Sequence, residues 1–158
     1  MRHLWLVAFS IGLALTSQAH AAPSTPSAYA LTGSCLSFTL AGRPLKRGCT
    51  GNLLNLNNER GGTAFTFTFA DGAIVSFEGV GAQQVNPTPN TAAQPINAVF
   101  FSLGISGIAP HRIKAVGVCR YANPGLGPMT VDCSAQTEDG AFTGRFQTDG
   151  RAPTEMRQ

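Results

Sequence analysis

The chain has few of the side chains from which binding and catalytic sites are commonly built. Only 12% of its 158 residues are charged, and it has three histidines, two tyrosines and one tryptophan. His3, Trp5 and His20 lie in the first 21 residues, so His111 is the only imidazole beyond that point and no indole remains. This scarcity disfavours a sugar site built on stacked aromatic rings.

Catalytic motifs are missing as well. A hydrolase triad needs a base, and the one available, His111, begins an expected strand, where a solvated histidine is the simpler interpretation. The G-x-S-x-G elbow does not occur. The carboxylates that could form a glycosidase pair are Glu78, Glu138 and Asp139. The simpler interpretation is that they are solvent-facing or turn residues. We predict no catalytic residue, and the alternative is a small enzyme of unidentified class that uses His111.

Metal and cofactor motifs are equally absent from the sequence. The cysteines lack the close Cys-x-x-Cys spacing of zinc sites. The Asp-Gly dipeptides occur singly, without the alternating acidic ligands of a calcium loop. We therefore predict neither a metal nor a cofactor.

The first 21 residues have the pattern of an export signal. Arg2 is followed by the apolar run 4–16 and by a small-x-small site that ends at Ala21. The run is short for a membrane span and no cysteine follows the site, so neither a membrane anchor nor a lipoprotein is expected. The pattern predicts a periplasmic or secreted protein.

Cleavage after Ala21 would leave 137 residues, enough for one domain. Ten Lys and Arg would then stand against eight Asp and Glu, a net charge of +2 that does not favour nucleic acid or an anionic membrane as partner. We expect a disordered lead-in over 22–28, a single β domain over 29–150 and a disordered tail over 151–158.

Four cysteines in an exported chain predict two disulfides. Three pairings are possible. Cys35 with Cys49 and Cys119 with Cys133 is preferred, because each pair brackets a turn-rich segment that can fold back on itself. Closing a loop of about fifteen residues is worth roughly 3 kcal/mol of stability in the chain-entropy model.

The two cysteine pairs belong to similar stretches of sequence. Thirteen residues separate the cysteines of each pair, and an Ala-Phe-Thr strand and an Asp-Gly turn follow each pair. We interpret this as an internal duplication of a stapled hairpin, a strand and a turn. The shared positions are Gly33, Cys35, Cys49, 64–66, Phe69 and 71–72 in the first copy and Gly117, Cys119, Cys133, 141–143, Phe146 and 149–150 in the second.

The clearest strand signal is the alternation of Phe and Thr after residue 63. A three-residue loop over 70–72 would place Phe65 and Phe67 opposite Phe77 and Val75, which keeps one face apolar. In the second stapled hairpin, a register with the cysteines opposite each other sets Arg120 against Asp132 as a solvent-side ion pair.

The remaining elements follow from the apolar and turn residues. We expect an irregular first hairpin from 29–40 and 45–49, at most one turn of helix at 53–58, a Pro-rich connection over 83–97, and strands at 98–108 and 141–146. Together they predict an all-β fold, an antiparallel sandwich or partly open barrel of roughly seven to nine strands.

These cysteine pairs and Asp-Gly turns, with Asn123 and Pro124, resemble a group of small exported bacterial proteins to which no activity is assigned. The resemblance implies a disulfide-bonded β domain and nothing more specific. The doubled Cys-x13-Cys is also similar to the cyanovirin-type lectins. The sugar-binding segments of these lectins have no counterpart in this chain, so the resemblance assigns no sugar-binding residue here.

Two basic clusters offer the most specific functional hypothesis. If the two clusters lie side by side, they form one cationic rim that could bind a phosphate, a sulfated sugar or an anionic lipid head. The simpler alternative is that they are two solvated loops whose charges protect strand edges. We expect a non-enzymatic envelope module that binds a small anion or a protein. The cluster residues are Arg43, Lys46, Arg47, His111, Arg112 and Lys114.

Overall fold

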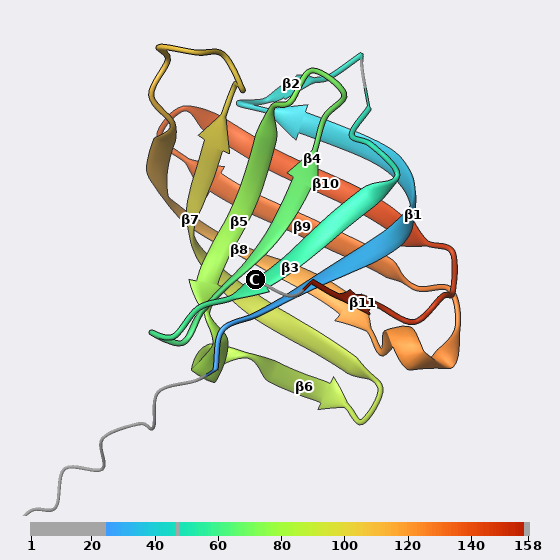
Figure 1. The fold of residues 1–158 in the computed structure, drawn as a ribbon. Helices are drawn as coiled ribbons and strands as arrows, with labels where there is room; N and C mark the ends of the chain where they lie inside the picture. The colour runs from blue at the N-terminus through green and yellow to red at the C-terminus, as the bar shows by residue number, and fades with distance from the viewer. Residues whose placement is uncertain (1–24, 47, 157–158) are drawn as a thin grey trace, which may run out of the picture.

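The computed structural model describes residues 25–46 and 48–156 as strands joined by short connections (Figure 1). The two helices, η1 (Gly81–Gln83) and η2 (Pro124–Leu126), are single turns, so no helix in these ranges could span a lipid bilayer. The predicted signal sequence and Arg47 lie outside the described residues. The strands are β1 (Ser27–Leu40), β2 (Arg43–Pro44), β3 (Asn52–Asn57), β4 (Gly62–Thr68), β5 (Ile74–Val80), β6 (Val85–Thr88), β7 (Thr91–Ser102), β8 (His111–Ala122), β9 (Thr130–Thr137), β10 (Gly140–Thr148) and β11 (Thr154–Glu155).

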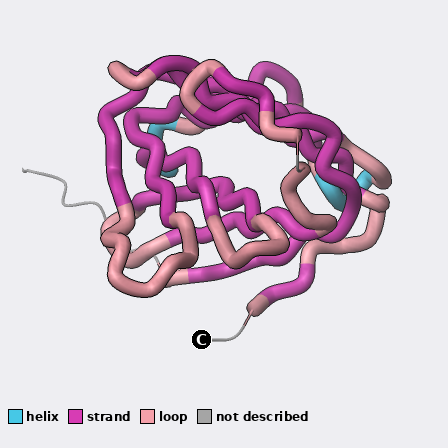
Figure 2. Tube along the Cα trace, turned by 90° about the horizontal axis from the view of Figure 1, so that it is seen from above, coloured by secondary structure: helices cyan, strands magenta, loops and turns pink. Residues whose placement is uncertain are grey.

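Eight of these strands form a closed antiparallel barrel. In the order β1, β3, β4, β5, β7, β8, β9 and β10, each strand pairs with the next, and β10 pairs with β1 to close the ring. The view along the axis shows this ring (Figure 2). The predicted all-β class is confirmed, and closure removes the free edges that an open sheet would expose.

Because neighbouring strands of the barrel run in opposite directions, the connections between them lie alternately at its two ends. The connections after β1, β4, β7 and β9 lie at one end, which is the upper end in Figure 1. The connections after β3, β5 and β8 lie at the other end, together with the start of β1. Residues far apart in the sequence therefore meet around each mouth of the barrel.

The hairpin of β4 and β5 has the predicted register. Phe65 pairs with Phe77 and Phe67 pairs with Val75. Gly72 closes the three-residue loop with a φ of 83°, and its N–H donates to the Phe69 carbonyl at 3.0 Å. This left-handed backbone is least costly at glycine, so the turn and the aromatic alternation favour the same register.

Phenylalanine rings fill the barrel. Phe67, Phe77, Phe142 and Phe146 are among the largest fully buried side chains. Phe38 meets the edge of Phe67 with ring centroids 5.2 Å apart, and Phe67 meets Phe77 at 5.7 Å. An eight-stranded barrel has an interior just wide enough for side chains, and these rings occupy it.

Both predicted disulfides are present. Cys35 bonds to Cys49 with their Cα atoms 5.3 Å apart, and Cys119 bonds to Cys133 with Cα atoms 4.0 Å apart. The second bond joins directly opposed residues of β8 and β9 inside the barrel. The first joins β1 to the segment before β3, so the two units differ in structure, and the internal duplication stays a prediction.

Several expected elements differ in the structure. Residues 53–57 belong to β3 and make no helical turn, because β1 and β4 pair with them on both sides. Residues 83–97 are largely the hairpin of β6 and β7, and Pro95 lies beside the bulge in β7, where its missing N–H is tolerated. The strand expected at 98–108 ends at Ser102, because Gly104 and Gly107 turn the chain with positive φ.

The expected domain limits and first hairpin also need correction. β1 begins at Ser27, inside the expected lead-in, and β11 lies inside the expected tail. Both are ordered by pairing, since β11 pairs with Tyr29 and Ala30 of β1. In the first hairpin only β2 pairs with the end of β1, and the described residues 45, 46, 48 and 49 are not in a strand.

The predicted register of the second stapled hairpin is confirmed, with Arg120 opposite Asp132. The predicted partner in the ion pair is wrong. The Asp132 carboxylate lies 3.5 Å from the guanidinium of Arg145 on β10. Asp132 sits between two arginines on the outer face, because β9 has a neighbour on each side.

The packing of the rings predicts the effect of one added methyl group. A Cβ on Gly144 would lie 2.7 Å from Phe67 Cζ and 2.9 Å from Phe38 Cε2. We expect Gly144→Ala to lower the free energy of unfolding by about 1–3 kcal/mol, as overpacking of a core does. Urea denaturation followed by circular dichroism measures this.

The matched control is Gly48→Ala, whose Cβ would meet only Cys35, with Sγ at 3.6 Å. We expect this variant to unfold within about 0.5 kcal/mol of the parent. Equal stability of the two variants would contradict a tightly packed interior.

Candidate functional site

Four hollows mark the described surface. One lies at each mouth of the barrel, one is a groove on its outer wall, and one of about 1150 Å³ lies beside β8 and is lined by His111, Arg112, Lys114, Glu138 and Asp139 among others. Ligand sites are concave and mostly apolar with a few polar groups, and barrel mouths are common places for them. Because phenylalanine fills the interior, a ligand has room at the mouths rather than along the axis.

The first hollow, here named the Lys46 mouth, has a volume of about 370 Å³. It lies at the end of the barrel where β1, β4 and β7 finish. Its walls are largely apolar, and the charged side chains among its lining residues are Lys46 and Asp71. The principal apolar walls are Leu40, Leu45, Phe69, Phe101 and Leu103.

Aromatic stacking holds the wall of the Lys46 mouth in place. The ring of Phe101 contacts two other rings. It stacks on His111 with ring centroids 5.3 Å apart and an angle of 18° between the ring planes, and its centroid lies 6.3 Å from that of Phe142. Phe69 meets the edge of Phe38 at 5.1 Å. Buried rings thus support the partly exposed rings, so the hollow has a fixed shape.

The rim of this mouth carries one cation and one anion with different surroundings. The Asp71 carboxylate accepts the backbone N–H of Ala73 at 3.1 Å, which ties Asp71 to its own turn. Lys46 is exposed, and none of the ion pairs among the described side chains includes it. The ammonium of Lys46 is therefore placed to meet an anionic group of a ligand.

The structure divides the six predicted basic residues. Lys46, Arg43 and His111 lie at the same end of the barrel, whereas Arg112 and Lys114 alternate with the inward Ile113 and so lie on the outer face of β8. Arg47 is outside the described residues. The five described residues do not line one hollow. Lys46 lines the Lys46 mouth, whereas His111, Arg112 and Lys114 line the hollow beside β8.

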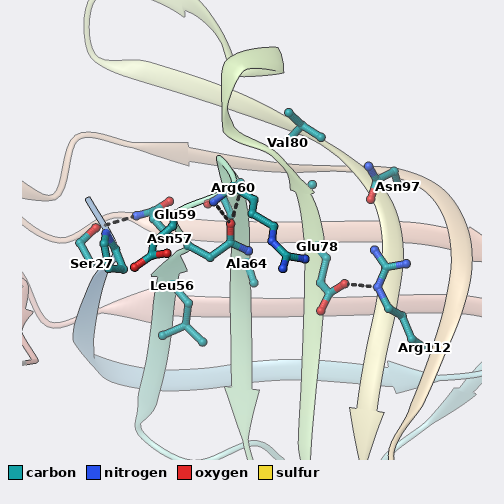
Figure 3. A pocket seen from close by; sticks show the side chains of 15 residues that line it. Ser27, Leu56, Asn57, Glu59, Arg60, Ala64, Glu78, Val80, Asn97 and Arg112 are labelled. Carbon is teal, nitrogen blue, oxygen red and sulfur yellow. Dashed lines mark hydrogen bonds and ion pairs between the residues drawn. The ribbon is translucent and has the colours of Figure 1, made fainter. Parts of the chain in front are cut away.

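Arg112 also contributes to the outer groove, shown in Figure 3. Its Nε donates to Glu78 Oε2 at 2.6 Å, and Figure 3 shows Arg60 extending toward the same glutamate. The groove has a volume of about 860 Å³ and is lined by both signs of charge. Because the Arg112 guanidinium is already paired with Glu78, this groove favours an anionic ligand less than a site with an unpaired cation does.

His111 is exposed at the start of β8. It stacks on Phe101, and no described hydrogen bond or ion pair joins it to a carboxylate or hydroxyl. Within residues 25–46 and 48–156 no three His, Cys, Asp or Glu side chains are grouped to hold a metal ion. His111 nevertheless lines the hollow beside β8 together with Glu138 and Asp139, so the histidine and the two carboxylates named from the sequence share one surface.

The fourth hollow, here named the Tyr121 mouth, lies at the opposite end and has a volume of about 290 Å³. The rings of Tyr121 and Phe65 lie 4.9 Å apart, and the Tyr121 hydroxyl donates to Gln84 Oε1 at 2.5 Å. Burial raises the pKa of the Tyr121 phenol, which keeps it neutral. The sequence did not reveal this site, because its aromatic residues come from strands far apart in the chain. Its lining is Tyr29, Leu31, Asn55, Phe65, Tyr121, Pro124, Met129 and Pro153.

A C-terminal strap, residues 149–156, runs along β1 at the edge of the Tyr121 mouth. The backbone N–H of Asp149 donates to the Thr32 carbonyl at 2.9 Å, and the N–H of Met156 donates to the Ala28 carbonyl at 2.7 Å. Between these contacts Pro153 lines the mouth. The strap therefore forms one wall of the hollow.

No family model, curated protein or solved structure matches the chain. The likeness to small exported proteins and to cyanovirin-type lectins stays an expectation. Function is therefore inferred from the geometry of the mouths.

The strap has a pH-dependent anchor at Asp149. The backbone N–H of Arg151 at 2.9 Å and the Thr32 hydroxyl at 2.7 Å donate to this carboxylate and hold its pKa below the ordinary value. A lowered pKa in the folded state stabilises the strap above the pKa of the unfolded chain, and this is lost as pH falls through the folded value. We expect the protection of the Met156 amide to be constant above about pH 5 and to fall below about pH 4.

Hydrogen-exchange protection factors, measured by NMR between pH 2.5 and 6, check this expectation. Asp149→Asn should lower the Met156 protection and remove its pH dependence. Asp139→Asn, in the exposed turn between β9 and β10, is the matched control. An unchanged profile in Asp149→Asn would contradict the anchor.

Proposed function

We propose that the protein is an exported binding module that takes a small amphipathic anion at the Lys46 mouth. The observation that carries the proposal is an apolar hollow of about 370 Å³ with an unpaired described lysine at its rim. Its volume falls in the usual range for ligand pockets. The apolar walls would hold the body of the ligand and the ammonium would hold its carboxylate or phosphate.

The loop beside the mouth supports an apolar ligand. Leu103, Ile105 and Ile108 are 42%, 56% and 45% exposed in the connection between β7 and β8. Exposed apolar side chains gathered beside a hollow are typical of a ligand-binding surface. Each square ångström of apolar surface that a ligand covers contributes about 25 cal/mol.

The disulfides support action outside the cytoplasm. Both bonds join described cysteines, and such bonds persist in the periplasm and in secreted proteins. With the export pattern of residues 1–21, they favour a soluble envelope or secreted role. The rival hypothesis is an enzyme that uses His111 with Glu138 or Asp139, which line the same hollow but share no described hydrogen bond with His111.

Isothermal titration calorimetry with decanoate and the uncharged decanol tests the proposal on the purified, oxidised protein. We expect decanoate to bind more tightly than decanol. Lys46→Met should weaken decanoate roughly twofold to fivefold, the worth of an exposed ion pair, and leave decanol unchanged. Leu103→Asp should weaken both ligands, because it places a charge in the apolar wall.

Two controls match these variants. Lys114→Met removes the same charge from the outer face of β8, and Leu126→Asp places the same charge at an exposed site near the other mouth. Neither should change binding. If decanoate does not bind, or if Lys114→Met weakens it as much as Lys46→Met, the Lys46 mouth is not the site.

A further inference from the structure

The Tyr121 mouth is built from one continuous row of side chains across neighbouring strands. Tyr29 of β1 pairs with Asn55 of β3, and Asn55 pairs with Phe65 of β4. On its other side Tyr29 pairs with Glu155 of the strap. Directly opposed residues in a sheet project to the same face, so this row points into the mouth.

The row combines aromatic rings with a single sign of charge. Tyr29 and Phe65 face Tyr121, which reaches the hollow from β8. The eight described lining residues are uncharged, and the nearest charge in the row is the carboxylate of Glu155. Aromatic faces carry negative potential, so the rings and the carboxylate attract the same kind of ligand.

A buried polar group lies one pair of residues further into the barrel than Tyr121. Gln94 is fully buried and pairs with Cys119, two residues before Tyr121 on the same face of β8. Its amide nitrogen donates to the carbonyls of Val80 at 2.9 Å and Pro95 at 3.0 Å. Its carbonyl oxygen has no hydrogen-bond partner in the described structure, so its negative dipole is uncompensated.

We propose that the Tyr121 mouth binds an organic cation with a quaternary ammonium head. Tyr29 and Tyr121 provide the aromatic surfaces, the buried Phe65 packs against Tyr121, and Glu155 supplies the complementary charge at the strap. A quaternary ammonium suits this site because its methyl groups pack on rings and prolines while its charge needs no hydrogen-bond acceptor. The hydrogen bond from Tyr121 to Gln84 holds the phenol in place before the ligand arrives.

Calorimetry with choline and its uncharged carbon isostere, 3,3-dimethylbutan-1-ol, tests the proposal. The two probes have the same shape and differ in charge, and we expect choline to bind about tenfold more tightly. Equal binding of the two probes would show an apolar hollow without selectivity for a cation and would overturn the proposal. Absence of choline binding would overturn it as well.

Variants locate the site. Tyr121→Leu should weaken choline about tenfold, whereas Tyr121→Phe, which keeps the ring, should stay within about twofold. Glu155→Gln, on an exposed residue whose loss leaves the barrel intact, should weaken choline about twofold to threefold, with less effect at high salt. Circular dichroism confirms that each variant is folded. If Tyr121→Leu does not fold, Glu155→Gln alone decides, and unchanged choline affinity in it contradicts the site.

Two further experiments distinguish binding at this site from binding at the Lys46 mouth and identify whether the cation is a free ligand or a lipid headgroup. Lys46→Met should leave choline affinity unchanged, and a loss there would overturn the assignment to the Tyr121 mouth. Cosedimentation with phosphatidylcholine vesicles, against phosphatidylglycerol vesicles as control, distinguishes a lipid headgroup from a free cation. Binding to the first vesicles alone indicates the headgroup, and binding to neither, with choline still bound, indicates a soluble ligand.

Discussion

The packing of phenylalanine rings inside the closed barrel is the constraint on which the rest of the structure depends. Closure of β1 against β10 fixes the width of the interior, and Phe38, Phe67 and Phe77 fill it with edge-to-face contacts. Gly144 is part of this arrangement, since a side chain there would overlap two of the rings. A barrel packed in this way offers binding space at its ends, so the function depends on the two mouths.

The two mouths differ because different connections build them. Leucine and phenylalanine side chains with one lysine and one aspartate surround one end, and tyrosine, proline and asparagine side chains with a neighbouring glutamate surround the other. A single small domain can thus present an apolar site with an unpaired lysine among its described side chains and an aromatic site beside a glutamate. The buried disulfide between Cys119 and Cys133 braces β8 and β9 between the mouths, and the strap anchored by Asp149 completes one of them.

The sequence predicted the parts of the fold that local pattern determines. The register of β4 and β5 followed from alternating phenylalanine and the Asp71-Gly72 turn, and the disulfides followed from cysteine spacing. The course of β7 was missed because proline usually argues against a strand interior. Pro95 is acceptable here because it lies near a bulge, in a part of β7 that pairs with β8 on one side only. Which basic residues share a surface depends on the face of the strand to which each side chain points and on the register of pairing. The presence of Tyr29 and Tyr121 in one hollow depends on closure of the barrel. Local sequence pattern determines neither.

The measurement that tests the central claim most directly is an NMR titration of amide shifts with decanoate and choline, singly and together. We predict that decanoate shifts amides around Leu40, Phe69 and Phe101, that choline shifts amides around Tyr29, Asn55 and Tyr121, and that the two sets of shifts add when both ligands are present. Shifts centred on Phe67 and Phe77 inside the barrel, or competition between the ligands for the same amides, would contradict a packed core that separates two binding mouths.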